Sequence, residues 1–245
     1  MTNPVHLILG GTGGIGSALA RQLAQSGARP VLAARGAERL GALGSELGAA
    51  TIEVDATQAD SVAAAVAHAR ETHGQLDGIV CCVGSIFLKP AHGTSTEQFQ
   101  ETLNANLLTA FHTVRAAAPV MGKAGAGSIV LMSSAAAGVG LPNHEAIAAA
   151  KAGVEGLTRS AAASYAPRGV RVNAVAPGLV DTPLAAGLLR NEKAREASGA
   201  MHPLGRIGHP EEIARAVGWL LDPSQSWVTG QVLRLDGGLS ALSGR

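Results

Sequence analysis

Short apolar runs alternate with longer segments of helical periodicity along the chain. The apolar runs predict strands at Val5–Gly10, Pro30–Ala34, Thr51–Val54, Gly78–Val83, Ser128–Met132, Val170–Ala176 and Gln231–Leu235. The helical periodicity predicts one helix that carries Lys151 and others at Gly14–Ser26, Ser61–Thr72, Thr96–Val120, Ala185–Ala197 and Pro210–Leu221. Continuously apolar strands are typical of burial on both faces. The alternation therefore predicts an α/β fold, a single doubly wound domain over residues 1–245 with a parallel sheet of roughly seven strands and helices on both faces.

The composition is that of a protein with a large aliphatic core. The 245 residues are 47% hydrophobic but only 2% aromatic, and their formal net charge is +1. Without a lysine- or arginine-rich run, neither nucleic acid nor a membrane surface is an expected partner. No sufficiently long apolar run predicts a membrane span, and the first residues lack the basic segment of a signal peptide, so we expect a cytoplasmic protein.

The two cysteines, Cys81 and Cys82, are adjacent in the fourth predicted strand. Neighbouring residues of a strand point to opposite faces, which disfavours a disulfide between them. We expect both to be free thiols in the core, as in a reducing compartment. No spacing of cysteine, histidine or acidic residues predicts a metal site.

A glycine-rich loop, GGTGGIG at residues 10–16, follows the first predicted strand and opens the first predicted helix. Glycines let the backbone turn tightly and approach a pyrophosphate, whose charge the free N–H groups and the helix dipole stabilise. We expect Gly10, Gly14, Ile15 and Gly16 to bind the cofactor. The alternative is a glycine turn without a ligand, but its place in a first βαβ unit favours a dinucleotide site.

The residues at the end of the second predicted strand indicate whether NAD(H) or NADP(H) binds. An acidic residue there would bind the ribose hydroxyls of NAD(H), and Ala34 stands in its place. Arg35 follows and suits a 2′-phosphate, although an exposed arginine with no ligand is the alternative. The expected cofactor is NADP(H), with NAD(H) less favoured.

Ordered motifs along nearly the whole chain resemble the short-chain dehydrogenase/reductase family, and most closely its 3-oxoacyl-thioester reductases. The glycine loop has the family's spacing G-x-x-x-G-I-G, and Asn106 lies five residues before Phe111 as the family's active-site asparagine does. Ser134 and Lys151 keep the spacing of the family's serine and lysine. The resemblance implies a Rossmann-like fold and an oxidoreductase.

The resemblance also implies roles for individual residues. Asn106 would hold a helix kink and a water chain, Ser134 would polarise the substrate carbonyl, and Lys151 would bind the nicotinamide ribose. Asp55 would contact the adenine, with a turn-forming aspartate as the alternative. The other residues implied at the cofactor are Gly84, the one glycine kept from the family's Asn-Asn-Ala-Gly, and Pro177, Gly178 and Thr182, which would close over the nicotinamide.

Ile147 stands where the family has its catalytic tyrosine, four residues before Lys151 and thirteen after Ser134. The usual proton donor is therefore missing. His144, seven residues before Lys151, occupies the offset at which enoyl reductases of this superfamily place their tyrosine, and an imidazole can exchange protons near neutral pH. A histidine at a helix start is the alternative, and we expect Glu145 to be a solvated first-turn acid.

Three functions are therefore open. The first is an NADP(H)-dependent oxidoreductase that acts on a carbonyl or an alcohol, such as a small molecule or an acyl thioester, with impaired or altered proton transfer. The second is an inactive cofactor-binding subunit, a pseudoenzyme, and the third is different chemistry on the same scaffold. Helices 96–120 and 146–163 are rich in small and apolar residues, and the family pairs these helices across a two-fold axis, so the resemblance implies a homodimer or homotetramer, or a hetero-oligomer with an active paralogue. Segment 181–202 caps the substrate pocket in the family, and its leucines and methionine lead us to expect an apolar lid.

Overall fold

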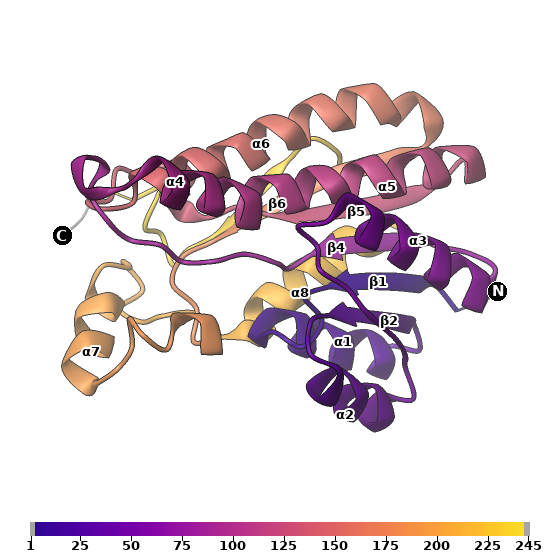
Figure 1. Cartoon of the computed structure of the whole chain (residues 1–245), viewed down its shortest axis with the longest axis horizontal. Coiled ribbons are helices and arrows are strands. Elements are labelled where there is room, and N and C mark those ends of the chain that lie inside the picture. The colour runs from indigo at the N-terminus through magenta and orange to yellow at the C-terminus, as the bar shows by residue number, and fades with distance from the viewer. Residues whose placement is uncertain (1–2, 243–245) are drawn as a thin grey trace.

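A computed structural model describes residues 3–242, which form a sheet covered by helices on both faces (Figure 1). Every pairing between neighbouring strands is parallel. The seven strands follow the order β3-β2-β1-β4-β5-β6-β7. Their bounds are β1 Val5–Leu9, β2 Arg29–Ala34, β3 Ala50–Glu53, β4 Gly78–Cys81, β5 Gly127–Met132, β6 Val170–Pro177 and β7 Val232–Leu235. The predicted doubly wound fold is confirmed.

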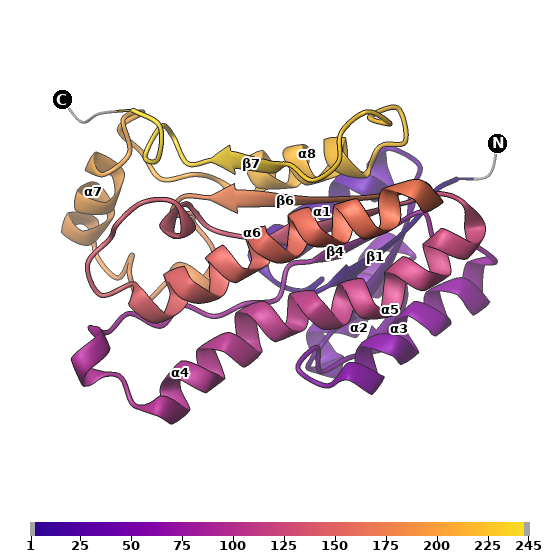
Figure 2. The same ribbon diagram turned by 90° about the horizontal axis from the view of Figure 1, so that it is seen from above.

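Each face of the sheet has its own apolar core. One core packs the sheet against α3 (Ala59–His73), α5 (Thr109–Ala124) and α6 (Glu145–Tyr165). The other packs it against α1 (Gly14–Gln25), α2 (Ala37–Leu47) and α8 (Pro210–Leu221). Figure 2 shows α5 and α6 lying side by side along one face. Successive residues of β1 pack alternately into the two cores. Because both faces of the strand are buried, its residues are continuously apolar and do not alternate with polar ones.

The predicted helix at Thr96–Val120 is in fact interrupted. It consists of α4 (Thr96–Leu103), a π-helical turn η2 (Asn104–Leu108) and α5, which continues to Ala124. The Asn106 side chain donates from Nδ2 to the Thr102 carbonyl at 3.0 Å, the oxygen that an α-helical N–H of residue 106 would use. This competition widens the turn, and it agrees with the predicted kink at Asn106.

Two further elements differ from the prediction. The predicted helix at Ala185–Ala197 is wrong in its bounds, because a 3₁₀ turn η5 (Pro183–Ala185) precedes a separate helix α7 (Glu192–Ala200). The Asn191 side chain caps α7 by accepting from Ala194 N at 2.9 Å, which fixes the later start. The helix α2 was not predicted, since four glycines lie in or next to its eleven residues.

The strand order places the site. From β1 the chain runs outward through β2 to β3, and it then crosses back to β4 on the other side of β1. The crevice at this switch point opens at the carboxyl ends of the strands, where doubly wound sheets bind their ligands. The loops after β1, β2, β4, β5 and β6 all end at this edge.

Candidate functional site

The glycine loop is shaped for a close approach of the backbone. Gly10 has φ +80°, a conformation that a residue with a side chain rarely adopts. A Cβ on Gly16 would collide with the Gly10 carbonyl oxygen. Helix α1 starts at Gly14 with no side-chain cap and no acidic residue in its first turn. Its first N–H groups and its dipole are therefore available to an anion.

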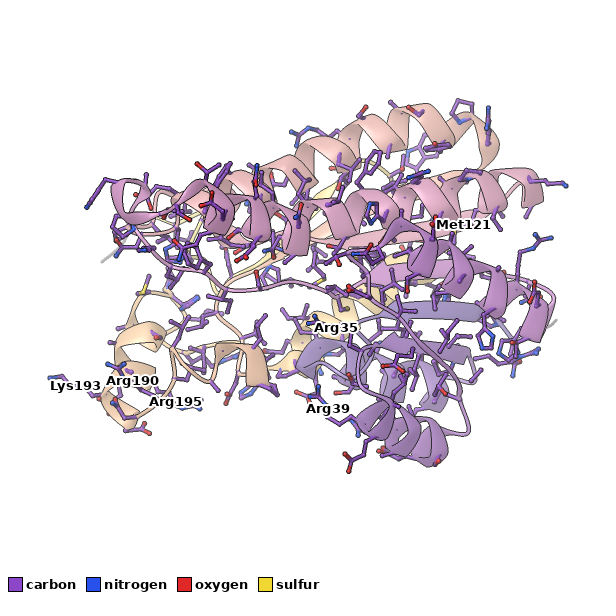
Figure 3. The ribbon with its side chains drawn as sticks, in the orientation of Figure 1. Arg35, Arg39, Met121, Arg190, Lys193 and Arg195 are labelled. Carbon is purple, nitrogen blue, oxygen red and sulfur yellow. The ribbon has the colours of Figure 1, made fainter. Side chains whose placement is uncertain are left out.

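Arg35 follows β2 and is exposed at the same edge of the sheet. Arg39, which was not predicted as a site residue, lies in the first turn of α2, and Figure 3 shows both arginines. Asp55 Oδ1 accepts from Thr57 Oγ1 at 2.7 Å and from Thr57 N at 3.0 Å, so this aspartate does form a turn. These hydrogen bonds, with a smaller contribution from the charge of Arg35, lower the pKa of Asp55.

The nicotinamide end that the sequence predicts corresponds to a cavity of about 150 Å³, called here the inner cavity. It brings together residues from the loops after β1, β4, β5 and β6 with others from η2 and α6. The predicted site residues that line it are Ile15, Gly84, Asn106, Ser134, Lys151, Pro177, Gly178 and Thr182. Ile147, where the family resemblance led us to expect a tyrosine, lines it as well.

Lys151 is buried at the inner cavity, with 7% of its surface exposed. Its Nζ donates to the Met132 carbonyl at 2.8 Å, which ties α6 to the end of β5. Burial lowers the pKa of the ammonium from 10.5 to about 8. Gly84 leaves room beside it, because a Cβ there would lie 2.9 Å from Asn106 Oδ1 and 3.5 Å from Lys151 Nζ.

Asn106 is buried in the π-helical turn and holds the loop after β4. Its Oδ1 accepts from Ser85 N at 3.1 Å, while its Nδ2 donates to Ser85 Oγ at 2.9 Å. With the bond to Thr102, both ends of the amide are engaged. This side chain therefore fixes the wall of the inner cavity.

Ser134 lies where β5 leads into a 3₁₀ turn, η3 (Ala135–Ala137), and its Oγ accepts from Ala136 N at 3.2 Å. The preceding Ser133 is buried, and its Oγ lies 3.2 Å from the Lys151 carbonyl and 3.1 Å from Glu155 Oε1. Glu155 in turn faces Arg234 of β7 at 3.6 Å. This network, which was not predicted, links the strand end that carries Ser134 to the helix that carries Lys151.

A second cavity, of about 430 Å³, adjoins the inner cavity and is called here the lid pocket. Ser134 and Ile147 line both cavities, so the buried isoleucine stands at their junction. His144 lines the lid pocket and lies just before α6. Its Nδ1 is 2.8 Å from the Pro142 carbonyl, which can only accept, so Nδ1 carries the hydrogen. Glu145 is exposed in the first turn of α6, as expected.

The two cysteines differ in their surroundings. Both are free, and Cys81 is buried in the core as predicted. Cys82 is partly buried: it packs against the core on the other face of the sheet, as expected, and it also lines the inner cavity. Burial raises the pKa of the Cys82 thiol, which keeps the sulfur protonated and unreactive.

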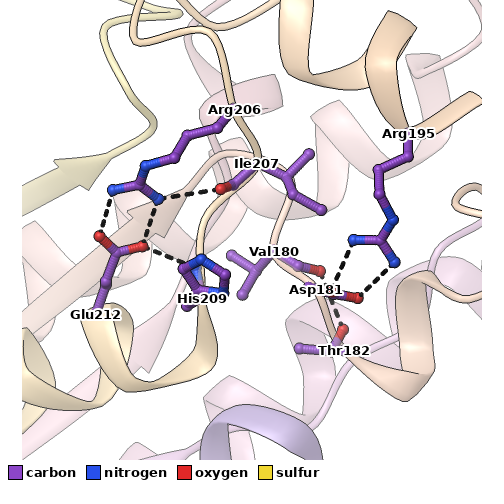
Figure 4. A network of polar contacts seen from close by, with 8 residues as sticks. All are labelled: Val180, Asp181, Thr182, Arg195, Arg206, Ile207, His209 and Glu212. Atoms are coloured by element: carbon purple, nitrogen blue, oxygen red, sulfur yellow. Dashed lines mark hydrogen bonds and ion pairs between the residues drawn. The ribbon is translucent and has the colours of Figure 1, made fainter. Parts of the chain in front are cut away.

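The segment after β6 folds over the glycine loop. A Cβ on Gly14 would lie 2.7 Å from Thr182 Cγ2, so glycine at this position lets the two segments meet. Asp181 holds α7 through two hydrogen bonds from Arg195, at 2.7 and 3.3 Å (Figure 4). On the other side of the same view, Arg206 pairs with Glu212 at 2.6 Å. The first ion pair lies within the predicted lid segment 181–202, and the second ties the residues just after that segment to α8.

Within residues 3–242, no three His, Cys, Asp or Glu side chains gather in a way that would hold a metal ion. None of the helices in that part of the chain has the length and hydropathy that crossing a membrane requires.

Comparison with known proteins extends these observations. The model of a family described as Enoyl-(Acyl carrier protein) reductase matches residues 10–240. The chain is 40% identical to cis-4-hydroxycyclohexanecarboxylate dehydrogenase of Sinomonas cyclohexanicum, over 97% of both chains. It is 37% identical to the 3-oxoacyl-[acyl-carrier-protein] reductase of Thermotoga maritima, over 96% of this chain and 97% of the relative.

Solved structures share the fold over almost the whole chain. A crystal structure of a substituted actinorhodin polyketide ketoreductase with NADPH superposes with a TM-score of 0.93 at 30% identity, over 98% of each chain. The family model and the relatives both extend over almost the full length. The chain therefore belongs to the short-chain dehydrogenase/reductase family.

Proposed function

We propose that this protein is an NADP(H)-dependent oxidoreductase that interconverts a carbonyl compound and an alcohol, with the proton transferred by a group other than tyrosine. The observation that supports this most is the inner cavity. It unites Ser134, Lys151 and Asn106 beside the glycine loop. A subunit that had lost all chemistry would have little use for a buried lysine held in that position, since burying its charge is costly.

The residues of the crevice fit a dinucleotide. Gly14 opens an uncapped helix that suits a pyrophosphate, and Gly84 leaves space between Asn106 and Lys151 that a side chain would fill. Gly10, Ile15 and Gly16 complete the loop, and Pro177, Gly178 and Thr182 form the opposite wall. When bound, the nicotinamide would supply or accept the hydride.

Arg35 and Arg39 support NADP(H) over NAD(H). Both guanidinium groups are exposed beside the end of β2, and Ala34 presents no carboxylate to ribose hydroxyls. A 2′-phosphate would gain charge-assisted hydrogen bonds there, each worth roughly 1.5–3 kcal/mol. Asp55, already committed to its turn, would contact the adenine through its remaining oxygen.

The chain's own residues would divide the work at the reacting centre. The Ser134 hydroxyl would donate to the substrate oxygen, and the Lys151 ammonium would orient the ribose hydroxyls. Ile147 has no proton to give. His144 lines the lid pocket together with Ile147, and with Nδ1 bonded to Pro142 its Nε2 is the nitrogen that would exchange the proton.

A cofactor-binding pseudoenzyme is the alternative, and one observation favours it. Ile147 is buried with 5% of its surface exposed, so it packs as a core residue where a phenol would have to reach the substrate. An exposed Phe111 and an apolar groove formed with Leu107, Leu108 and Leu157 support a homodimer or homotetramer, or a hetero-oligomer with an active paralogue.

Calorimetry with NADPH and NADH tests the cofactor assignment. NADPH should bind about ten- to a hundredfold more tightly than NADH, and Arg35→Ala should remove most of that difference. Arg159→Ala, which removes an exposed arginine from α6, is the matched control. Equal affinities for the two dinucleotides, unaffected by Arg35→Ala, would refute the assignment.

Turnover of a panel of ketones and of a 3-oxoacyl thioester tests the chemistry. If His144 carries the proton, native turnover is measurable and His144→Ala lowers it by about 10²–10⁴-fold, the usual contribution of a general acid. If neither the native protein nor His144→Ala shows turnover and Ile147→Tyr does, the pseudoenzyme hypothesis is correct. NADPH binding without any turnover in a folded Ile147→Tyr variant would show that position 147 alone does not silence the site.

A further inference from the structure

The lid pocket defines the chemical class of the substrate, on the premise that the proposed function is correct. It joins the inner cavity at Ser134 and Ile147 and has a volume of about 430 Å³. None of the side chains that line it in residues 3–242 is an aspartate, glutamate, lysine or arginine. Its polar side chains are two serines and two histidines, and the rest of the wall is formed by alanine, leucine, isoleucine, methionine and one glycine.

Helix α7 presents one small, uncharged face to this pocket. Ala194, Ala197 and Ser198 of the helix, and Met201 at its C-cap, line the pocket with the three- and four-residue spacing of a single helix face. The charged residues of the helix lie on its other faces. Lys193 extends away from the body of the molecule in Figure 3. The small side chains leave the space that the substrate would occupy.

His202 has no hydrogen-bonding capacity left for a ligand. Its Nδ1 lies 2.9 Å from the Ser198 carbonyl and must donate to it, while its Nε2 accepts from Leu179 N at 3.2 Å. The side-chain groups that remain for a substrate oxygen are Ser134 and His144, at the junction with the inner cavity or close to it, and the Ser198 hydroxyl on α7. All three are uncharged hydrogen-bonding groups, and Ser134 is the one that also lines the inner cavity.

The arginines near the pocket are already paired. Arg206 and Arg234 line a neighbouring cavity that meets the lid pocket at Gly178, Leu179 and His202. Glu212 binds Arg206 at 2.6 Å, and Glu155 lies 3.6 Å from Arg234. Neither arginine lines the lid pocket itself.

On the α7 side, Arg195 is held by Asp181 at 2.7 Å. A carboxylate or phosphate entering the lid pocket would therefore lose water without meeting a cation, which is strongly unfavourable. A neutral apolar group would lose no such hydration and would gain from the burial of its surface.

We infer that the substrate is a neutral ketone, or the corresponding secondary alcohol, with a compact aliphatic or alicyclic body that fills the lid pocket and carries no charged group. Its oxygen lies at the Ser134 end of the pocket, and its apolar body extends towards α7. Ala194 and Ala197 set the room available to that body, and Met201 lies on the same helix face.

Ligand binding tests this without requiring turnover. The probes are methyl 4-oxocyclohexanecarboxylate and 4-oxocyclohexanecarboxylate, which differ by one charge, with cyclic ketones of increasing ring size, each titrated by calorimetry into the NADPH-saturated protein. The neutral ester should bind at least about tenfold more tightly than the carboxylate. A carboxylate that binds as tightly as its ester overturns the inference, and so does failure of the ester and of every cyclic ketone to bind.

Two variants sharpen the result. Met201→Arg should improve carboxylate binding about tenfold or more, whereas Met201→Gln, of similar length but uncharged, should not. Ala197→Leu should weaken the larger ketones while NADPH affinity stays unchanged. Equal effects of Met201→Arg and Met201→Gln on the carboxylate would count against the inference. Ketones that bind but are never reduced would refute the proposed oxidoreductase and leave the ligand class standing.

Discussion

Replacing Lys151 by methionine should leave the free energy of unfolding at neutral pH unchanged or raise it. The same substitution should weaken cofactor binding. The buried ammonium has a pKa of about 8, against 10.5 for an ordinary lysine, because burial disfavours its charge. At 1.36 kcal/mol per pH unit, this difference corresponds to about 3 kcal/mol of stability that the folded protein forgoes at neutral pH. Methionine has a similar length and carries no charge.

The pH dependence separates this effect from ordinary packing. Between pH 8 and pH 10.5 the unfolded chain holds the lysine proton more tightly than the folded protein does, so the stability of the wild type rises with pH across this window. The stability of Lys151→Met lacks this contribution. The wild-type value minus the variant value should therefore increase by about 3 kcal/mol from pH 7 to pH 10.5.

Guanidinium denaturation at half-unit pH steps measures the two free energies of unfolding. At pH 7 the variant should equal or exceed the wild type, because the relief of about 3 kcal/mol is offset by leaving the Met132 carbonyl without its donor, at about 1–3 kcal/mol. Lys193→Met, which changes an exposed lysine, is the control. A wild-type-minus-variant difference that stays flat with pH would refute the reasoning. NADPH affinity should fall in Lys151→Met.

Three other predictions follow from single positions. Gly84→Ala should weaken NADPH binding by roughly 1–3 kcal/mol in calorimetry, because the added methyl group would lie 2.9 Å from Asn106 Oδ1 and would approach Lys151. Unchanged affinity would mean that the neighbouring side chains move to accommodate the methyl group. Burial lowers the pKa of His6 to about 4, so on acidification the unfolded chain binds a proton before the folded protein does. Between pH 6.5 and about pH 4, the free energy of unfolding should therefore fall by about 3 kcal/mol more in the wild type than in His6→Leu. Parallel acid-denaturation curves for the two proteins would contradict this. Phe111→Glu should reduce the assembly to monomers in sedimentation, since Phe111 is 46% exposed over an apolar groove, and an unchanged sedimentation coefficient would exclude that face from the interface.

The elements of the fold could be predicted from the sequence wherever the hydrophobic pattern was strong. The parallel strands are buried on both faces, so their apolar runs stand out, and α8 was located at Pro210–Leu221 with its true bounds. The signal failed where propensity and packing disagree. In α2 the glycines conceal the helix, although Leu40 and Leu43 fill the core, and the start of α7 depends on the cap at Asn191 rather than on periodicity.

The site was predictable as a set of positions but not as a geometry. The spacing of Ser134, Ile147 and Lys151 implied that these residues meet, and all three line the inner cavity. The sequence could not show that Ile147 lies at the junction of two cavities, or that His144 lines the lid pocket. Such facts depend on how separate loops pack, which no local pattern encodes.

Other site contacts had even weaker signals. Ser133 and Glu155 meet across 22 positions of the chain, and His202 reaches Leu179 across 23. Each is a single polar residue in an otherwise ordinary segment. Only their burial and their partners, which the folded chain provides, distinguish them from solvated side chains.

A small apolar cluster beside the lid pocket, formed by Ala185, Leu189 and Ile207 with Leu179 packed against it, is separate from the two cores of the sheet. The side chains that α7 and its C-cap turn towards the lid pocket, Ala194, Ala197 and Met201, belong to none of these three clusters. Substitutions at these three positions should therefore reshape the pocket wall with little effect on the free energy of global unfolding. Libraries randomised at Ala194, Ala197 and Met201 should consequently retain a high fraction of folded members.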